Sequence, residues 1–161
     1  MSKTVTVGIS DLNVVRSPDV LVTYALGSCA GICLYDSVTR IAGMSHIMLP
    51  SSTMAHAAGQ EYRFADTGIV ALVKKMTTMG ANPSRLKAKI AGGAQMFACT
   101  NNKDLGNIGA RNVMAVKETL AKLRIPIIAE DTGKDYGRTL YFYAETGQMR
   151  VKSAKQGEWT W

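Results

Sequence analysis

Residues 30–48 read AGICLYDSVTRIAGMSHIM, and this stretch decides the fold. Two apolar runs, over residues 30–35 and 40–48, have the composition and length of strands. Residues 36–39, DSVT, lie between them and have the polar composition of a turn. The stretch therefore predicts a β-hairpin.

The rest of the chain predicts shorter strands and two helices around this hairpin. Apolar residues recur at helical spacing from Ile69 to Met76, and Gly80 fits the end of that helix. A second helical pattern covers residues 108–123, with Asn107 as its N-cap. Further strands are predicted over residues 4–9, 20–24, 86–91, 125–129, 140–144 and 149–152. Together these elements predict an α/β or α+β protein built in layers.

The composition indicates one ordinary globular domain. Of the 161 residues, 47% are hydrophobic and 19% are charged, which is enough to bury a core. We expect a single domain over residues 1–152 and a C-terminal tail over residues 153–161, polar except for Trp159 and Trp161. The net charge is +7, but the basic residues are scattered and form no basic–aromatic patch. This distribution argues against binding of nucleic acid.

Cysteine usage and hydropathy both predict a cytoplasmic protein. Cys29, Cys33 and Cys99 are an odd number, without the paired framework of a secreted disulfide protein. The N-terminus has no apolar signal region, and no stretch approaches the ~20 apolar residues of a membrane span. We therefore expect reduced cysteines and no membrane insertion.

Cys29 is the candidate nucleophile and His46 the candidate base. The cysteine follows a Gly27-Ser28 bend, where consecutive backbone N–H groups can point at one spot and form an oxyanion hole. His46 lies in the second strand of the predicted hairpin, and an adjacent imidazole is the usual way to activate a thiol at neutral pH. Thr23, at the end of the preceding strand, could orient the imidazole through its second nitrogen.

Structural interpretations compete with these assignments. Small cysteines are commonly buried and inert, and a histidine in a strand is commonly a hydrogen-bonded core residue. His56 is a rival base, but its polar loop makes a fixed geometry with the thiol harder to keep. Cys33 and Cys99 fall in apolar segments and are predicted to pack in the core. The cysteines and histidines lack the short paired spacings of structural zinc sites, so we expect no metal.

Two further motifs have ordinary explanations. Gly92-Gly93 follows a predicted strand, as phosphate-binding turns do, but the dinucleotide and P-loop fingerprints are absent. We therefore expect no cofactor. Glu130-Asp131 could be a carboxylate pair, but adjacent residues of a strand point to opposite faces. A turn or a structural hydrogen-bonding role is the favoured interpretation.

Five short motifs occur in order within residues 3–152: LGSC at 26–29, SHIMLP at 45–50, KIAGGA at 89–94, NIGARN at 107–112 and AEDTG at 129–133. In this order they resemble the bacterial chemoreceptor glutamine deamidase family, CheD. The resemblance implies a layered α/β sandwich with mixed, mostly antiparallel sheets and two main helices. It also implies a catalytic triad of Cys29, His46 and Thr23.

The resemblance further implies an activity and partners. The family hydrolyses the side-chain amide of selected receptor glutamines to glutamate and releases ammonia, and methylesterase activity on receptor glutamyl esters is also attributed to it. The implied partners are the helical cytoplasmic domains of chemoreceptors, as substrates, and the CheY-phosphate phosphatase CheC, as a regulator. Because the enzyme must read a helix surface, we expect a shallow groove beside Cys29, with residues 50–60 as its rim.

Three other classes of protein stay open at this point. The first is a non-catalytic docking module that binds CheC or receptors, for which an activated thiol would serve no purpose. The second is a thiol amidase of small molecules, which would release ammonia from free glutamine. The third is a basic nucleic-acid binder, which salt-dependent retention on DNA would reveal.

Overall fold

The predicted hairpin lies inside a five-stranded sheet. In the computed structural model, which describes residues 2–54, 59–96, 108–154 and 157–161, the hairpin strands are β4 (Ala30–Asp36) and β5 (Ile41–Ile47). They pair antiparallel and are joined to β2 (Asp11–Arg16), β6 (Lys87–Gly92) and β7 (Ile127–Thr132) in the order β2-β5-β4-β6-β7. We call this sheet the inner sheet.

Asp36 holds the turn of the hairpin. Its buried carboxylate accepts hydrogen bonds from the backbone N–H groups of Val38 and Thr39 inside the turn and from that of Asn82 outside it. The Arg85 guanidinium donates two further bonds, at 2.9 and 2.8 Å, and holds the pKa of this carboxyl well below its usual range. The polar residues that predict a turn therefore also anchor it to the segment before β6.

A second five-stranded sheet packs on the inner sheet, and we call it the outer sheet. Its strands are β1 (Thr4–Thr6), β3 (Val20–Leu26), β8 (Arg138–Tyr143), β9 (Met149–Ser153) and β10 (Gly157–Thr160), in the order β1-β3-β8-β9-β10. The pairs β1–β3 and β6–β7 are parallel, and the other pairs within the two sheets are antiparallel. The expectation of mixed, mostly antiparallel sheets is confirmed.

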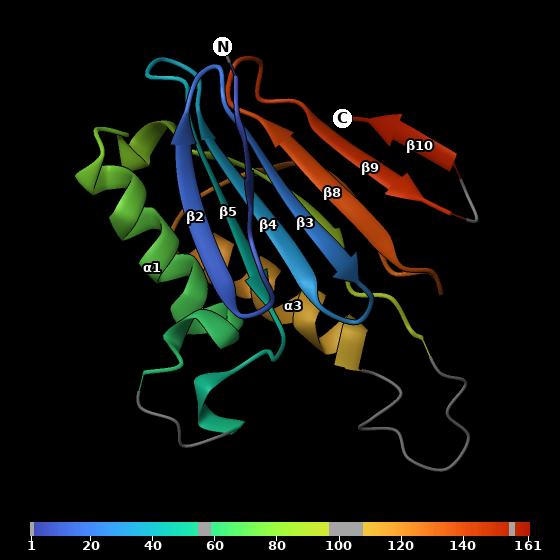
Figure 1. Cartoon of the computed structure of the whole chain (residues 1–161). Coiled ribbons are helices and arrows are strands. Elements are labelled where there is room, and N and C mark those ends of the chain that lie inside the picture. Colours follow the sequence, from blue (N-terminus) through green and yellow to red (C-terminus); the bar gives the residue numbers. More distant parts are fainter. Residues whose placement is uncertain (1, 55–58, 97–107, 155–156) are drawn as a thin grey trace.

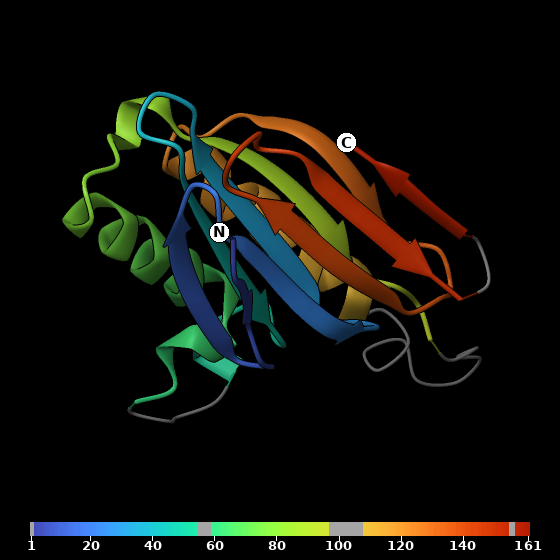
Figure 2. The same cartoon turned by 45° about the horizontal axis from the view of Figure 1, so that its top comes forward.

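Two helices cover the face of the inner sheet that points away from the outer sheet (Figures 1 and 2). They are α1 (Ala65–Thr78) and α3 (Ile108–Lys122), and short 3-10 turns occur at Ser52–Met54, Glu61–Arg63 and Pro83–Arg85. Along β4 the side chains alternate: Ile32 and Leu34 pack with the helices, whereas Cys33 packs between the sheets. The predicted layered α/β sandwich with two main helices is thus confirmed.

Four elements differ from the sequence-based expectations. The first strand, β1, ends at Thr6 and not at residue 9. Residues 11–16, which we did not expect to form a strand, are β2, paired with β5 along its whole length. β7 begins at Ile127, because Pro126 has no N–H to donate to a ladder and only its carbonyl bonds the neighbouring strand. In the predicted tail, residues 157–160 form β10, and the backbone of Trp161 exchanges hydrogen bonds with that of Met149.

Among the residues that the structure describes, no helix is long and apolar enough to cross a membrane.

Candidate functional site

His46 is fully buried between the two sheets. It lies on β5, on the same face as Ala42 and Met44, and those two side chains pack in the core between the sheets. Opposite this face, on β3 of the outer sheet, the equally buried Thr23 places its Oγ1 2.7 Å from His46 Nδ1. Thr23 and His46, far apart in the sequence, are therefore in direct contact.

The hydrogen bonds of Thr23 determine which imidazole nitrogen carries the proton. Thr23 Oγ1 donates its only hydrogen to the backbone carbonyl of Val7, at 2.7 Å. It can then only accept from His46, so the imidazole proton lies on Nδ1. The other ring nitrogen, Nε2, keeps a free lone pair, and among the described residues it has no hydrogen-bond partner. This is the tautomer in which a histidine can accept a proton at Nε2.

Cys29 lies on the same face of the inner sheet as His46. It precedes β4 directly, and strand alternation places its side chain with Cys33 on the face toward the outer sheet, where it packs against the core. Gly31, two residues further on, is the register partner of His46 on β5. Cys29 and His46 are thus diagonal neighbours across one antiparallel pair, a relation that brings side chains within reach of each other. No hydrogen bond joins the two side chains in this structure.

Burial of the two groups favours their neutral forms. Desolvation raises the pKa of the Cys29 thiol, and a hydrogen bond from its own backbone N–H offsets this in part. Desolvation lowers the pKa of His46 to about 4. At neutral pH the resting pair is therefore a thiol and a neutral imidazole.

The loop that carries Cys29 is anchored through three consecutive carbonyl groups. The Gly27 carbonyl accepts a hydrogen bond from Ala94 N at 2.9 Å, and the Cys29 carbonyl accepts one from Gly93 N at 2.8 Å. Between them, the Ser28 carbonyl accepts one from the Asn112 side chain at 2.9 Å. Gly27 N–H donates to Ala25 O at 3.1 Å, so the candidate oxyanion donors are the N–H groups of Ser28 and Cys29.

Gly92 allows the chain after β6 to reach this loop. It has a φ of +102°, and a Cβ built on it would lie 2.4 Å from the Cys29 carbonyl oxygen. Any side chain here would displace Cys29 or the turn that bonds it. The Gly92-Gly93 motif therefore serves close backbone packing behind the nucleophile candidate.

Asn112 is a residue of the site that the sequence analysis did not single out. It is fully buried on α3, and its Nδ2 donates to the carbonyls of Ser28 and Met48, each at 2.9 Å. Ser28 directly precedes Cys29, and Met48 lies two residues after His46. The signal in the sequence was the place of Asn112 at the end of the NIGARN motif over residues 107–112, to which no chemical role was assigned. A buried amide in a helix needs hydrogen-bond partners from elsewhere in the fold.

Other sequence predictions for site residues have mixed outcomes. Cys33 is fully buried in the core, as expected. His56 and Cys99 lie outside the described residues, so nothing is said of their positions. Glu130 and Asp131 diverge along β7 and bind different partners, namely Lys117 at 3.0 Å and the buried Arg138 at 3.0 Å, which agrees with the expected structural role. Within the described ranges, no three His, Cys, Asp or Glu side chains form a metal-binding group.

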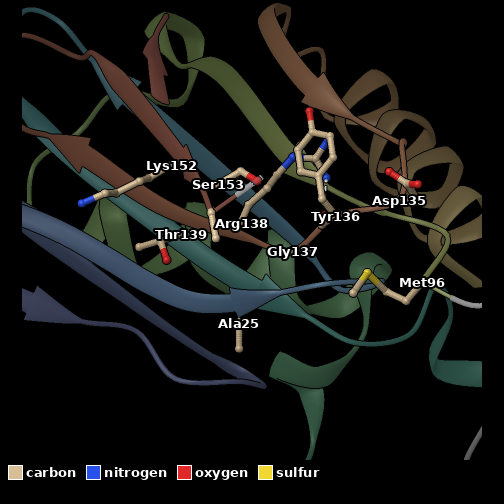
Figure 3. A pocket seen from close by; sticks show the side chains of 10 residues that line it. Ala25, Met96, Asp135, Tyr136, Gly137, Arg138, Thr139, Lys152 and Ser153 are labelled. Atoms are coloured by element: carbon tan, nitrogen blue, oxygen red, sulfur yellow. Dashed lines mark hydrogen bonds between the residues drawn. The ribbon is translucent and has the colours of Figure 1, made fainter. Parts of the chain in front are cut away.

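A hollow of about 480 Å³ adjoins the Cys29 loop on its outer-sheet side (Figure 3). Met96 and Ala25 border it near the loop, and Lys152 lies at its opposite end. Met96 also packs over the backbone of Gly27, since its Cγ lies 3.3 Å from where a Cβ of that glycine would be. The guanidinium of Arg138 stacks over the Tyr136 ring, 4.4 Å from its centroid, and both residues line the hollow.

The two sheets, the helical layer and the buried threonine–histidine pair beside a partly exposed cysteine define an α/β sandwich protein with a candidate thiol site. The chain belongs to the CheD family: the family described as CheD chemotactic sensory transduction matches residues 48–153. Thr23, Cys29 and His46 precede that matched segment.

Full-length relatives carry the family's name. A protein of Caldanaerobacter subterraneus subsp. tengcongensis named probable chemoreceptor glutamine deamidase CheD is 53% identical over 97% of this chain and 96% of its own length. A relative of the same name from Syntrophomonas wolfei is 50% identical over 98% of both chains. Chemoreceptor glutamine deamidase CheD of Halalkalibacterium halodurans is 48% identical, also over 98% of both chains.

Proposed function

We propose that this chain is a chemoreceptor glutamine deamidase, a hydrolase that converts selected receptor glutamines to glutamate. Membership of the CheD family and the names of its full-length relatives support the substrate class. The observation that carries the chemistry is the tautomer of His46. Because Thr23 Oγ1 accepts a hydrogen bond from Nδ1–H, the Nε2 lone pair, which has no partner among the described residues, is free to act as a base toward a thiol on the same sheet face.

In the proposed mechanism, Cys29 Sγ attacks the carboxamide carbon while its proton moves to His46 Nε2. The amide oxygen becomes an oxyanion, which the backbone N–H groups of Ser28 and Cys29 stabilise. As the C–N bond breaks, Nε2 returns the proton to the nitrogen, which leaves as ammonia, and a thioester remains. Water then attacks the thioester and gives a proton to Nε2, which passes it to the departing sulfur. The net reaction consumes one water and yields glutamate and ammonia.

Thr23 has a positioning role in this mechanism. In the tetrahedral intermediate, the negative oxyanion is accompanied by a positive imidazolium of His46 between the sheets. Thr23 Oγ1 stays bonded to Nδ1–H throughout. A receptor glutamyl methyl ester has the same acyl carbon, with methanol as the leaving group. We therefore propose that the same site also has methylesterase activity. Binding to CheC-type phosphatases stays a prediction of the family resemblance, and a cytoplasmic location stays a prediction from cysteine usage and hydropathy.

Mass spectrometry of receptor fragments tests the proposed function. Purified cytoplasmic fragments of receptors from the same cell are incubated with the unaltered protein, with Cys29→Ala and with Cys33→Ala. We expect replacement of NH₂ by OH at specific glutamines with the unaltered protein and with Cys33→Ala, which removes a core thiol but leaves the candidate site intact. Cys29→Ala is expected to abolish the reaction.

Two outcomes would contradict the proposal in different ways. Deamidation that persists with Cys29→Ala would rule out Cys29 as the nucleophile while leaving the substrate class in place. No modification of any receptor by the unaltered protein would favour the docking module, in which the site binds receptors or CheC without chemistry.

A further inference from the structure

Asn112 fixes the peptide plane that carries one of the two candidate oxyanion donors. A trans peptide group is planar, with its C=O and N–H pointing in opposite directions. The Ser28 carbonyl and the Cys29 N–H belong to one such group. Because Asn112 Nδ2 donates to the Ser28 carbonyl from the α3 side, the Cys29 N–H must point away from α3. That N–H lies beside its own sulfur, to which it donates.

The position of this N–H suits a donor for an oxyanion. When Sγ bonds to the carbon of the substrate amide, the oxygen on that carbon lies within reach of a donor beside the sulfur. A rotation of the Ser28–Cys29 peptide would replace the N–H with a carbonyl, which repels an oxyanion. The hydrogen bond from Asn112 opposes that rotation, because it would leave both a buried amide and a carbonyl unsatisfied.

The second bond of Asn112 anchors the amide itself. Its Nδ2 also donates to the Met48 carbonyl, just beyond β5, so both of its hydrogens are committed. If the amide were flipped, Oδ1 would face the two carbonyls and could donate to neither. The two bonds therefore fix the orientation of the side chain. The backbone around Met48 is held in turn by a bond from Met48 N to the Arg63 carbonyl, at 2.8 Å.

We propose that Asn112 is a positioning residue for the oxyanion hole: its two bonds, to the Ser28 and Met48 carbonyls, hold the Cys29 N–H toward the reacting carbon. This inference rests on the proposed function, in which Cys29 is the nucleophile. Because Asn112 is fully buried, we expect it to affect the transition state without contributing to substrate binding.

Two small probes of the same thiol isolate this role. p-Nitrophenyl acetate acylates a cysteine through a tetrahedral oxyanion, whereas iodoacetamide alkylates it by displacement of iodide, without an oxyanion. Peptide mass spectrometry assigns each label to Cys29 in the unaltered protein and in Asn112→Asp, which keeps the shape of the side chain but removes the amide nitrogen that makes both bonds. The ratio of the acylation rate to the alkylation rate is the measured quantity.

We expect the ratio in Asn112→Asp to fall at least about tenfold, toward the roughly hundredfold cost of losing one oxyanion donor. Deamidation of receptor fragments should lose kcat by a similar factor, with KM unchanged. Asn112→Ala should show the same loss of ratio without a new charge, and it serves as the second variant if the aspartate prevents folding. An unchanged ratio in a folded variant, or an equal fall of both rates, would overturn the proposal.

Thr119→Val is the matched control. Thr119 is also buried on α3, but its hydroxyl donates to the Ala115 carbonyl of the same helix and reaches neither carbonyl of the site. Its substitution should lower stability without changing the ratio. If the unaltered protein deamidates no receptor while the ratio still falls in Asn112→Asp, the proposed function fails and the positioning role stands. If deamidation is observed and the ratio does not change, the positioning role alone fails.

Discussion

His46 shows how one side chain depends on neighbours from distant parts of the chain. Its position on a strand and its contact with Thr23 were predicted from the sequence and are observed, whereas its action on Cys29 stays a prediction. The protonated nitrogen was not predicted, because it follows from the acceptor of the Thr23 hydroxyl, the Val7 carbonyl next to β1. Local patterns do not specify which backbone carbonyl a buried hydroxyl will reach.

The buried His46 predicts an unusually acidic lower limit for activity. Its pKa is lowered from 6.5 to about 4, so the neutral base is present above about pH 4. Asp11 on β2 is the register partner of His46, and its carboxylate accepts a hydrogen bond from Gly8 N. We expect kcat/KM for deamidation to be half-maximal near pH 4 on the acid side and level from about pH 5 to 7. An acid limb near 6.5 would contradict this.

Stability must be followed in the same experiment. A histidine with a lowered folded-state pKa binds fewer protons in the folded chain than in the unfolded chain between pH 4 and 6.5. Its contribution to the free energy of unfolding is thus fully present above pH 6.5 and is lost as the pH falls toward 4. Circular dichroism at each pH separates loss of the folded state from protonation of the base.

At the scale of elements, the packing of α3 against the turn after β6 positions the Cys29 loop. Gly109 lies against the turn after β6, where a Cβ would come within 2.3 Å of the Ala94 carbonyl oxygen and 2.6 Å of that of Gly93. Ala94 and Gly93 are the two residues whose N–H groups bond the carbonyls on either side of Ser28. The helix that carries Asn112 and the turn that anchors the loop are therefore packed as one unit.

Gly109→Ala should disrupt the packing of α3 against the turn after β6. Alanine favours a helix by about 1 kcal/mol over glycine, but the collision with two carbonyls must shift either α3 or the turn. We expect the free energy of unfolding to fall by about 1–3 kcal/mol. Deamidation should fall at least about tenfold, since a misplacement of ~1 Å can cost about a hundredfold in rate. Urea unfolding and receptor-fragment assays measure the two effects.

Arg111→Ala is a suitable control for that substitution, because Arg111 lies exposed on the same helix. It should change neither the urea midpoint nor the deamidation rate appreciably. Full activity in Gly109→Ala would show that the site tolerates a shift of α3, contrary to the packing described above.

The sequence analysis predicted both helices and most strands, because their apolar periodicity is local. It did not predict β2, whose partner is β5, or β10, whose partner is β9. Both strands lie at the edge of a sheet and have only short apolar runs. Their strand conformation therefore depends on pairing with a neighbouring strand.

At the scale of the whole molecule, the C-terminal segment that contains β10 connects the outer sheet to the inner one. Trp159 packs on the core between the sheets and meets the Tyr136 ring edge-on, with centroids 6.4 Å apart. Lys89, on the inner-sheet strand β6, donates to the Trp161 carbonyl at 2.8 Å. Residues 157–161 therefore link the two sheets at an edge away from the Thr23–His46 contact.

Deletion of residues 157–161 should lower stability and spare activity. The loss of a half-buried tryptophan and of the β9 pairing predicts a fall in the free energy of unfolding of about 2 kcal/mol. The deamidation rate of the folded protein at 25 °C should stay close to that of the full chain, because none of the proposed triad contacts β10. Thermal unfolding together with the receptor-fragment assay checks both expectations, and loss of activity in a folded truncated protein would contradict them.

The sequence by itself determined the hairpin, the helical layer and the short list of candidate site residues, because strand alternation, helical spacing and a glycine–serine bend before a cysteine are local patterns. Only the tertiary structure decided that Thr23 bonds His46 Nδ1, that Asn112 spans the Ser28 and Met48 carbonyls, and that the thiol and imidazole rest in their neutral forms. Hydrogen-bond partners and desolvation depend on which elements pack together, and no local pattern carries that information.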